Sequence, residues 1–267
     1  MADLDAVSDV IDLDRYPIHE LDSERGKALV AFCRASLDFE GACQLPGFIK
    51  PAAVTALVDE ALAKQEQAWR TDDKHNVYFE KVEDAATGST KSLLQHTSKS
   101  AVAWDLVDQE SPLRRAYEWD GLTKFLGSAL GIDPLYRYAD PLGAASLMIF
   151  EAGDELGWHF DRSPFAVTVM LQPAAAGGEY QYHHHLRTGT DENEAGVVAA
   201  LDDRQPGRIT LPNPPGALSM FRGQYSMHRV TPIEGPERRI NAVLAYSERP
   251  DDVMNELTQK LFYGRTA

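Results

Sequence analysis

The feature that most constrains the fold is a series of short apolar runs that begins near Leu135 and continues toward the end of the chain. Glycine and proline separate the runs, and no helical pattern alternates with them, which is typical of antiparallel barrels and double-sheet jelly rolls. We therefore predict a mainly β core over residues 135–267. The predicted strands are Ala145 to Phe150, Leu156 to Phe160, Ala166 to Gln172, Glu179 to His183, Arg208 to Leu211, Ala217 to Phe221 and Ile240 to Tyr246.

Residues 1–134 show mainly helical patterns. Apolar residues recur at helical spacing in two segments, one that begins near Ser23 and one with Pro51 in its first turn. We expect the helices to pack on one sheet of the core, so that the chain forms one structural unit. Two more helices are predicted over Pro112 to Trp119 and Leu122 to Leu130, and a short strand over Gly41 to Ile49, whereas Arg70 to Ser100 carries no clear pattern.

Composition and charge argue against several classes of function. The chain has 41 acidic and 26 basic residues and a net charge of -15, which would repel nucleic acid or an anionic membrane surface. No apolar stretch approaches the roughly 20 residues that span a bilayer. The N-terminal residues are acidic where a signal peptide needs a basic start, so we expect a cytoplasmic protein. Cys33 and Cys43 are too few for a disulfide framework and are predicted to be packing residues.

The motif His159-Phe160-Asp161 carries the clearest chemical signal. Because side chains alternate faces along a strand, His159 and Asp161 point the same way, while Trp158 and Phe160 are expected to pack beneath the outer helices. His228, in a later part of the core, could supply a third ligand. Two histidines and one carboxylate on one face of a metal leave coordination positions open, as in the non-haem Fe(II) oxygenases. We predict a metal site at His159, Asp161 and His228.

Two arginines stand at the head of the last predicted strand. A buried guanidinium is costly unless an anion pairs with it, and a dicarboxylate co-substrate that chelates the metal would supply that anion. Strand parity separates the two, because Arg239 shares its face with Asn241 whereas Arg238 shares its face with Ile240. We predict that Arg239, with Asn241 beside it, binds the co-substrate.

These residues resemble the HxD...H...R pattern of the Fe(II)/2-oxoglutarate-dependent dioxygenases. The resemblance implies an α+β fold, a double-stranded β-helix or jelly roll with N-terminal helices packed on one sheet. It also implies Fe(II) on the predicted triad, 2-oxoglutarate as co-substrate with its distal carboxylate on Arg239, and dioxygen as oxidant. Four segments are similar to the group of carrier-independent amino-acid halogenases and their hydroxylase relatives, namely Leu156 to Asp161, Gly177 to Tyr182, Phe221 to Gly223 and Tyr263 to Arg265.

Asp161 distinguishes this chain from the halogenases that it resembles. Those enzymes have a small residue at this position, which leaves a coordination site for chloride. The resemblance therefore implies hydroxylation of an unactivated C–H bond, or desaturation or ring closure, rather than halogen transfer. It implies a small polar metabolite as substrate, such as a free amino acid or a derivative, and it leaves the oligomeric state open.

Other polar residues allow two interpretations each. Three adjacent histidines alternate faces on a strand and cannot all reach one ion, so a strand end or site rim is expected for His183 to His185. Arg222 could contact substrate or form an ion pair, and Glu151 and Asp154 could bind a substrate amine or cap the turn at Gly153. The segment Thr188 to Gln205 could be a solvated loop or a lid, and Asp140 could face the mouth of the cavity.

Two other classes of function stay open at this point. A jelly-roll protein could bind a metal or a small ligand without turnover, although a complete open-site triad with a co-substrate arginine argues against this. A protein hydroxylase would need a site that admits a peptide, and no separate peptide-binding domain is apparent in the sequence.

Overall fold

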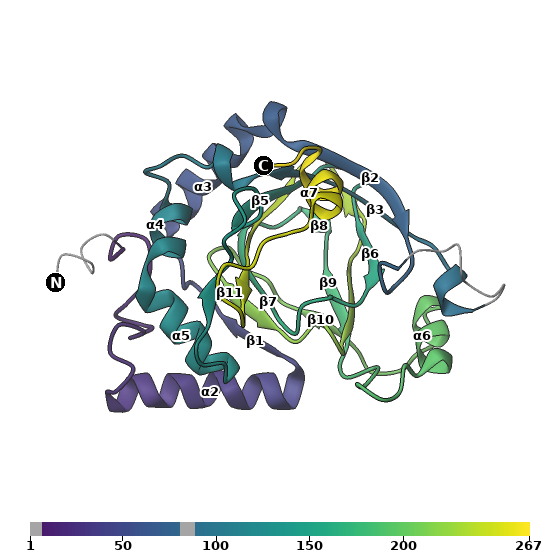
Figure 1. Ribbon diagram of the computed structural model, residues 1–267, viewed down its shortest axis with the longest axis horizontal. Coiled ribbons are helices and arrows are strands. Elements are labelled where there is room, and N and C mark those ends of the chain that lie inside the picture. The colour runs from purple at the N-terminus through teal and green to yellow at the C-terminus, as the bar shows by residue number, and fades with distance from the viewer. Residues whose placement is uncertain (1–6, 81–88) are drawn as a thin grey trace.

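The computed structural model describes residues 7–80 and 89–267. Its centre is one curled antiparallel sheet with helices around it, which confirms the predicted α+β jelly roll (Figure 1). The helices are α2 (Glu24–Glu40), α3 (Pro51–Ala63), α4 (Pro112–Glu118), α5 (Asp120–Leu130), α6 (Glu194–Leu201) and α7 (Glu256–Tyr263), with short 3-10 turns at Gln65–Gln67, Thr90–Ser92 and Trp104–Leu106. The strands are β1 (Ala42–Leu45), β2 (Trp69–His75), β3 (Gln95–Val102), β4 (Tyr136–Arg137), β5 (Ala145–Phe150), β6 (Leu156–His159), β7 (Ala166–Gln172), β8 (Ala176–Gly177), β9 (Tyr180–His183), β10 (Arg208–Leu211), β11 (Leu218–Phe221), β12 (Met227–Val230), β13 (Ile233–Glu234), β14 (Arg239–Leu244) and β15 (Tyr246–Ser247).

The strand order shows how the chain crosses between two halves of the sheet. The order is β1-β11-β7-β14-β5-β3-β6-β12-β9-β10, with β2 paired to β3. Strands β5, β7, β11 and β14 lie in one half, and β6, β9, β10 and β12 in the other, so consecutive core strands mostly alternate between them. This crossing places β6 next to β12, although many residues separate them in the sequence.

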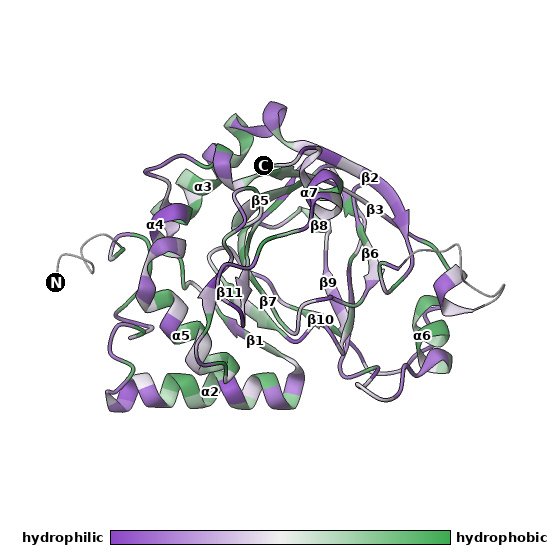
Figure 2. Ribbon diagram, viewed as in Figure 1, coloured by the Kyte–Doolittle hydropathy of each residue, from purple (hydrophilic) through white to green (hydrophobic). Residues whose placement is uncertain are grey.

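The first part of the chain supplies strands as well as helices, which corrects the expectation of a mainly helical region over residues 1–134. Strand β1 pairs with β11, and β3 lies between β5 and β6. The sequence pattern hides β3 because polar side chains lie on both of its faces, Ser98 and Ser100 on one and Thr97 and Lys99 on the other. Strand β2 is a polar edge strand, largely hydrophilic in Figure 2, and charged residues protect such an edge from pairing with other chains.

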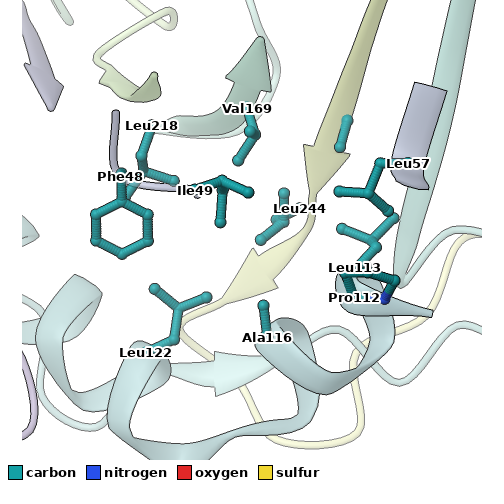
Figure 3. Close-up of a pocket in the computed structure, with 11 residues that line it drawn as sticks. Phe48, Ile49, Leu57, Pro112, Leu113, Ala116, Leu122, Val169, Leu218 and Leu244 are labelled. Carbon is teal, nitrogen blue, oxygen red and sulfur yellow. The ribbon is translucent and has the colours of Figure 1, made fainter. Parts of the chain in front are cut away.

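Capping residues set the ends of the N-terminal helices. The Ser23 hydroxyl accepts a hydrogen bond from the Gly26 N–H at the start of α2, and the helix ends at Gly41, which has a φ of 73°. Helix α3 begins with Pro51. These helices cover the convex face of β1, β5 and β7, where side chains of α4, α5 and the sheet converge on a small apolar cavity of about 10 Å³ (Figure 3). A space of this size is at the lower limit for one water, so it is a packing gap rather than a ligand site.

Helix α6 comes from the insertion between β9 and β10 and lies on the far side of the sheet from α2 to α5 (Figure 1). Its buried residues Val197 and Ala200 pack with Trp158 and Phe160. The two aromatic residues are buried beneath an outer helix as predicted, and that helix is α6. Since these side chains point away from the ligands of the same strand, α6 lies behind the predicted site, and the lid interpretation of this helix is wrong.

None of the helices in the described ranges is long and apolar enough to cross a membrane.

Candidate active site

The two histidines of the predicted triad lie opposite each other on neighbouring strands. His159 of β6 pairs directly with His228 of β12, and the centroids of their rings are 4.1 Å apart. The register between these strands shifts by one residue between His228 and Val230, which pairs with Leu156. Because of this bulge, both Leu156 and His159 face the interior of the barrel, although an even strand would point them to opposite sides.

Each histidine is oriented by a backbone carbonyl two residues earlier. His159 Nδ1 donates to the carbonyl of Gly157 at 2.8 Å, and His228 Nδ1 donates to the carbonyl of Ser226 at 3.0 Å. A carbonyl can only accept, so the proton is on Nδ1 and the lone pair is on Nε2. This is the arrangement that directs Nε2 of a histidine to a metal.

Asp161 completes the cluster just after β6. Its Oδ1 lies 3.6 Å from His159 Nε2 and 3.5 Å from His228 Nε2. Gly223 packs against the carboxylate: a Cβ atom at Gly223 would lie 1.8 Å from Asp161 Oδ2, and the Gly223 carbonyl accepts from the Asp161 N–H at 3.1 Å. Among the described residues, this triad is the one group of three or more ligating side chains whose atoms lie within 4.8 Å of one another.

The electrostatics of the cluster favour a cation. Burial and, secondarily, His228 lower the pKa of His159 to about 4, so the ring is neutral at pH 7. Burial alone would raise the pKa of Asp161, but His228 and His159 hold it well below its usual range. Asp161 Oδ2 is buried and has no hydrogen-bond partner in the described part of the chain. A buried carboxylate with Oδ1 next to two histidine nitrogens, and with no hydrogen bond to its Oδ2, fits a divalent metal such as iron.

Arg239 lies on the interior face of β14 and Arg238 does not. Arg239 is 4% exposed, donates to Asn241 Oδ1 at 2.5 Å and to the carbonyl of Gly178 at 3.2 Å, and stacks over Phe150. Arg238 is partly exposed and pairs with Glu151 at 3.3 Å. Burial lowers the pKa of Arg239 to about 10, so it stays charged at pH 7, and no carboxylate of the described residues pairs with it. This point of the barrel is therefore suited to bind an anion.

Aromatic side chains enclose the space around the triad. Tyr180 stacks on His228 with ring centroids 5.5 Å apart, and Phe221 meets His228 edge to face at 4.9 Å. Burial, with the charge of Asp161 as second cause, raises the pKa of Tyr180 well above its ordinary value. These rings exclude water from one side of the cluster, which strengthens the electrostatic interactions inside.

The sequence analysis missed the part of the site that comes from the segment after β2. His75 lies 6.1 Å from His159 and Phe79 lies 5.2 Å from it, measured between ring centroids. His75 Nδ1 bonds the carbonyl of Asn76 at 2.9 Å, and His75 Nε2 accepts from the hydroxyl of Thr97 at 2.6 Å. His75 and Phe79 stand out in the sequence only as a histidine and an aromatic residue within a polar segment. Nothing in the sequence placed this segment beside His159.

Several ambiguous residues prove to be structural. Arg222 forms an ion pair with Asp38 at 2.8 Å. Asp154 is buried, pairs with Arg70 and accepts from the N–H of Glu151, so it caps the turn before β6. Asp140 is fully buried and accepts from the N–H groups of Leu142, Gly143 and Met254 and from the side chain of Gln259, so it anchors the C-terminal segment and does not face a cavity mouth.

The remaining motif residues also have structural contacts. No metal cluster of the described residues includes His183, His184 or His185. Cys33 and Cys43 are both free and buried, as predicted. Tyr263 is buried in the barrel, and Gly264 ends α7 with a φ of 71° against the ring of Trp69.

Comparison with known families identifies the chain. The sequence profile of the family described as Halogenase D matches residues 26–263. The chain belongs to the Halogenase D family. The match includes the triad, Arg239 and the strands that carry them. No curated protein sequence shows significant similarity to the chain.

Solved structures with the same fold have distant sequences. This member of the Halogenase D family is similar to an oxidoreductase of the 2OG-Fe(II) oxygenase family from Burkholderia pseudomallei, with 15% identity, a TM-score of 0.51, and 82% of this chain and 91% of that chain covered. It is similar to the epimerase SnoN in complex with Fe3+, alpha ketoglutarate and nogalamycin RO, with 14% identity and a TM-score of 0.57. The match covers 82% of this chain and 84% of that chain. It is also similar to the carbocyclase SnoK, with 16% identity, a TM-score of 0.53, and coverage of 82% and 83%.

Proposed function

We propose that this protein is an Fe(II)- and 2-oxoglutarate-dependent oxygenase that hydroxylates an unactivated C–H bond of a small polar molecule, with a free amino acid or a derivative as the first candidate. The observation that carries the proposal is the pair of unmet charges in one barrel. The Asp161 carboxylate, whose Oδ1 lies beside the two Nε2 atoms and whose Oδ2 accepts no hydrogen bond, has no cation to balance it, and the buried guanidinium of Arg239 has no carboxylate partner among the described residues. A metal chelated by a dicarboxylate would satisfy both groups at once.

Each residue of the site has a defined task in this proposal. His159 and His228 offer their Nε2 atoms, and Asp161 offers an anionic oxygen, so the three would hold iron on one face. Arg239, held by Asn241 and Gly178, would bind the distal carboxylate of 2-oxoglutarate. Iron with its co-substrate supplies the oxidising power when bound, and the protein positions the substrate and excludes water through Tyr180, Phe221 and Phe79.

Asp161 also favours oxygen transfer over halogen transfer, despite the name of the family. If Asp161 holds the metal, its carboxylate would take the position that a halide would need. Desaturation and ring closure need the same ligands and stay possible outcomes of the same site. A non-catalytic metal-binding protein would have no use for an unpaired buried arginine next to the metal site.

The direct test is succinate formation from 2-oxoglutarate with Fe(II), screened against pools of free amino acids and their derivatives. We expect stimulation by a small molecule, and its loss in His159→Ala and His228→Ala variants that keep the wild-type circular dichroism spectrum. Full activity in either variant would refute the triad. Stimulation by peptides alone would instead identify a protein hydroxylase.

Product mass analysis in the presence of chloride tests the reaction type. We expect the wild-type protein to give a product that is heavier than the substrate by one oxygen atom, and no chlorinated product. Asp161→Gly should be mostly inactive, because the change removes a charged ligand as well as opening a position. Substantial chlorination by the wild-type protein would show that Asp161 does not bind the metal.

A further inference from the structure

Lys99 is a buried cation on the barrel interior that the proposed function leaves without a role. It lies on β3 and is only 8% exposed. Within the described ranges of the chain its ammonium group makes no hydrogen bond or ion pair, and Nζ lies over the ring of Phe262, 5.4 Å from the centroid. Burial lowers the pKa of Lys99 to about 8, so the amine is still largely protonated at pH 7. An uncompensated ammonium at such a position is costly and indicates that an anion binds there.

Strand register shows which way Lys99 points. Ala101 pairs with Met148, and Met148 pairs with Asn241, so these three side chains lie on one face. Lys99 is two positions from Ala101 and therefore shares the interior face with Asn241. Thr97, two positions to the other side, bonds His75 beside the triad. Lys99 thus lies between the end of the barrel that Ala101 lines and the metal site.

Helix α7 encloses Lys99 from the end of the barrel. Trp69 Nε1 on the neighbouring strand β2 donates to the carbonyl of Leu261 at 3.2 Å, which holds the helix against the sheet. Phe262 and Tyr263 join the apolar cluster that contains Ala101 and Met148. On the other side, the charge of Lys99 adds to burial in lowering the pKa of His75. The apolar wall lies on the side of α7, and the polar residues Thr97 and His75 lie on the side of the triad.

The carboxylates of 2-oxoglutarate are already accounted for in the proposed function. In that proposal one end would bind the metal held by the triad, and the other would meet Arg239. Lys99 lies two strands from Arg239, and Phe150 of the intervening strand β5 separates them, since Phe150 pairs with Arg239 and its ring lies 5.2 Å from the Arg239 guanidinium. An anion at Lys99 would therefore be a third one, contributed by another molecule.

We propose that Lys99 binds a carboxylate group of the primary substrate, which makes the substrate a small carboxylic acid. This inference rests on the proposed function, because it assigns the other two anionic groups to 2-oxoglutarate. The ammonium would fix one end of the substrate between His75 and Phe262 and present the remainder to the triad. A neutral ester or amide of the same molecule would lose the charge-assisted contact.

The test uses full-length protein loaded with Mn(II) and saturating 2-oxoglutarate, without oxygen. The probes are the proteinogenic amino acids and simple mono- and dicarboxylic acids, each compared with its amide by thermal shift and calorimetry. We expect at least one acid to bind and its amide to bind roughly 10–100-fold more weakly, the range for one charged hydrogen bond. Lys99→Met should lose this preference, Lys99→Arg should retain part of it, and Lys74→Met, which changes an exposed lysine of β2, should behave as wild type.

Two further measurements separate this role from other roles of Lys99. If Lys99 serves binding rather than folding, Lys99→Met without ligand should be at least as stable as wild type, because it removes an unpaired buried charge. Its affinity for 2-oxoglutarate should stay within about twofold of wild type, whereas Arg239→Met should lose most of that affinity. Loss of 2-oxoglutarate binding in Lys99→Met would overturn the inference in favour of the co-substrate. A panel in which no acid is preferred over its amide would also overturn it, and a wild-type protein that does not bind 2-oxoglutarate would refute the proposed function and this inference with it.

Discussion

His159 and His228 face each other across two antiparallel strands, and each donates its Nδ1 proton to the carbonyl of the residue two positions before it. The two rings therefore present their Nε2 lone pairs to the same point from opposite strands. Neither orientation depends on a carboxylate partner, so the ligand geometry is built into the backbone of β6 and β12. Thr97 helps to hold the Gly157 carbonyl that accepts from His159 in place. The N–H of Gly157 donates to the hydroxyl of Thr97 at 3.0 Å.

Thr97 should control metal affinity through this support. Its hydroxyl accepts from Gly157 and donates to His75, so it fixes the peptide whose carbonyl orients His159. We expect Thr97→Val to weaken Zn(II) or Co(II) binding roughly 10–100-fold, as removal of groups that orient ligands commonly does. Thr97→Ser should restore most of the affinity, and Thr210→Val, an exposed strand threonine, should have no effect. Equal affinities for Thr97→Val and wild type, measured by chelator competition, would show that Gly157 needs no such support.

Gly223 should be intolerant of any side chain. A methyl group there would occupy the position of Asp161 Oδ2 and displace the carboxylate. We expect Gly223→Ala to bind metal at least roughly 10-fold more weakly while its far-ultraviolet spectrum is preserved. The matched control is Gly189→Ala, where the nearest atom would be the Tyr225 hydroxyl at an ordinary 3.5 Å. Wild-type metal affinity in Gly223→Ala would mean that Asp161 can leave this position without cost.

The two adjacent arginines should differ sharply in co-substrate binding. Arg239 is buried and unpaired, whereas Arg238 is partly exposed and already pairs with Glu151. We expect Arg239→Met to weaken 2-oxoglutarate binding roughly 10–100-fold, because the variant loses one charge-assisted hydrogen bond. Arg238→Met should change the binding little. Calorimetry on the Mn(II)-loaded protein measures both. The opposite ranking would place the co-substrate outside the barrel face that Arg239 and Asn241 share.

The metal-free protein should lose stability on mild acidification. Burial lowers the pKa of His159 from 6.5 to about 4 and also lowers the pKa of His75, so the folded state binds these protons less readily than the unfolded state. The stability from the neutral form of His159 is complete above pH 6.5 and is lost as the pH falls from 6.5 toward 4, and the neutral form of His75 acts in the same direction. One such histidine contributes a slope of up to about 1.4 kcal/mol per pH unit.

Urea unfolding of the chelator-treated protein between pH 7.5 and 5 measures this slope. Replacement of His159 by Phe should flatten it, since the variant has one fewer proton to take up on unfolding. An unfolding free energy that rises as the pH falls, or an unchanged slope in the variant, would contradict the assignment.

The triad, the arginine and most core strands could be predicted from the sequence, because each depends on local spacing. Alternation along β6 is enough to put His159 and Asp161 on one face, and parity along β14 is enough to separate Arg239 from Arg238. The predicted bounds of β5, β7 and β10 agree with the structure for the same reason, since short apolar runs between turns define them.

Tertiary structure alone decided the rest. Strand β3 and its interior residues Thr97 and Lys99 were not predicted, because a strand with polar residues on both faces has no periodic signal and is recognised only by its partners β5 and β6. The approach of Gly223 to Asp161 and the position of α6 behind Trp158 likewise depend on which surfaces meet after folding. Sequence spacing determines which side chains share a face of one strand, whereas contacts between distant strands follow from sheet closure, which local patterns do not encode.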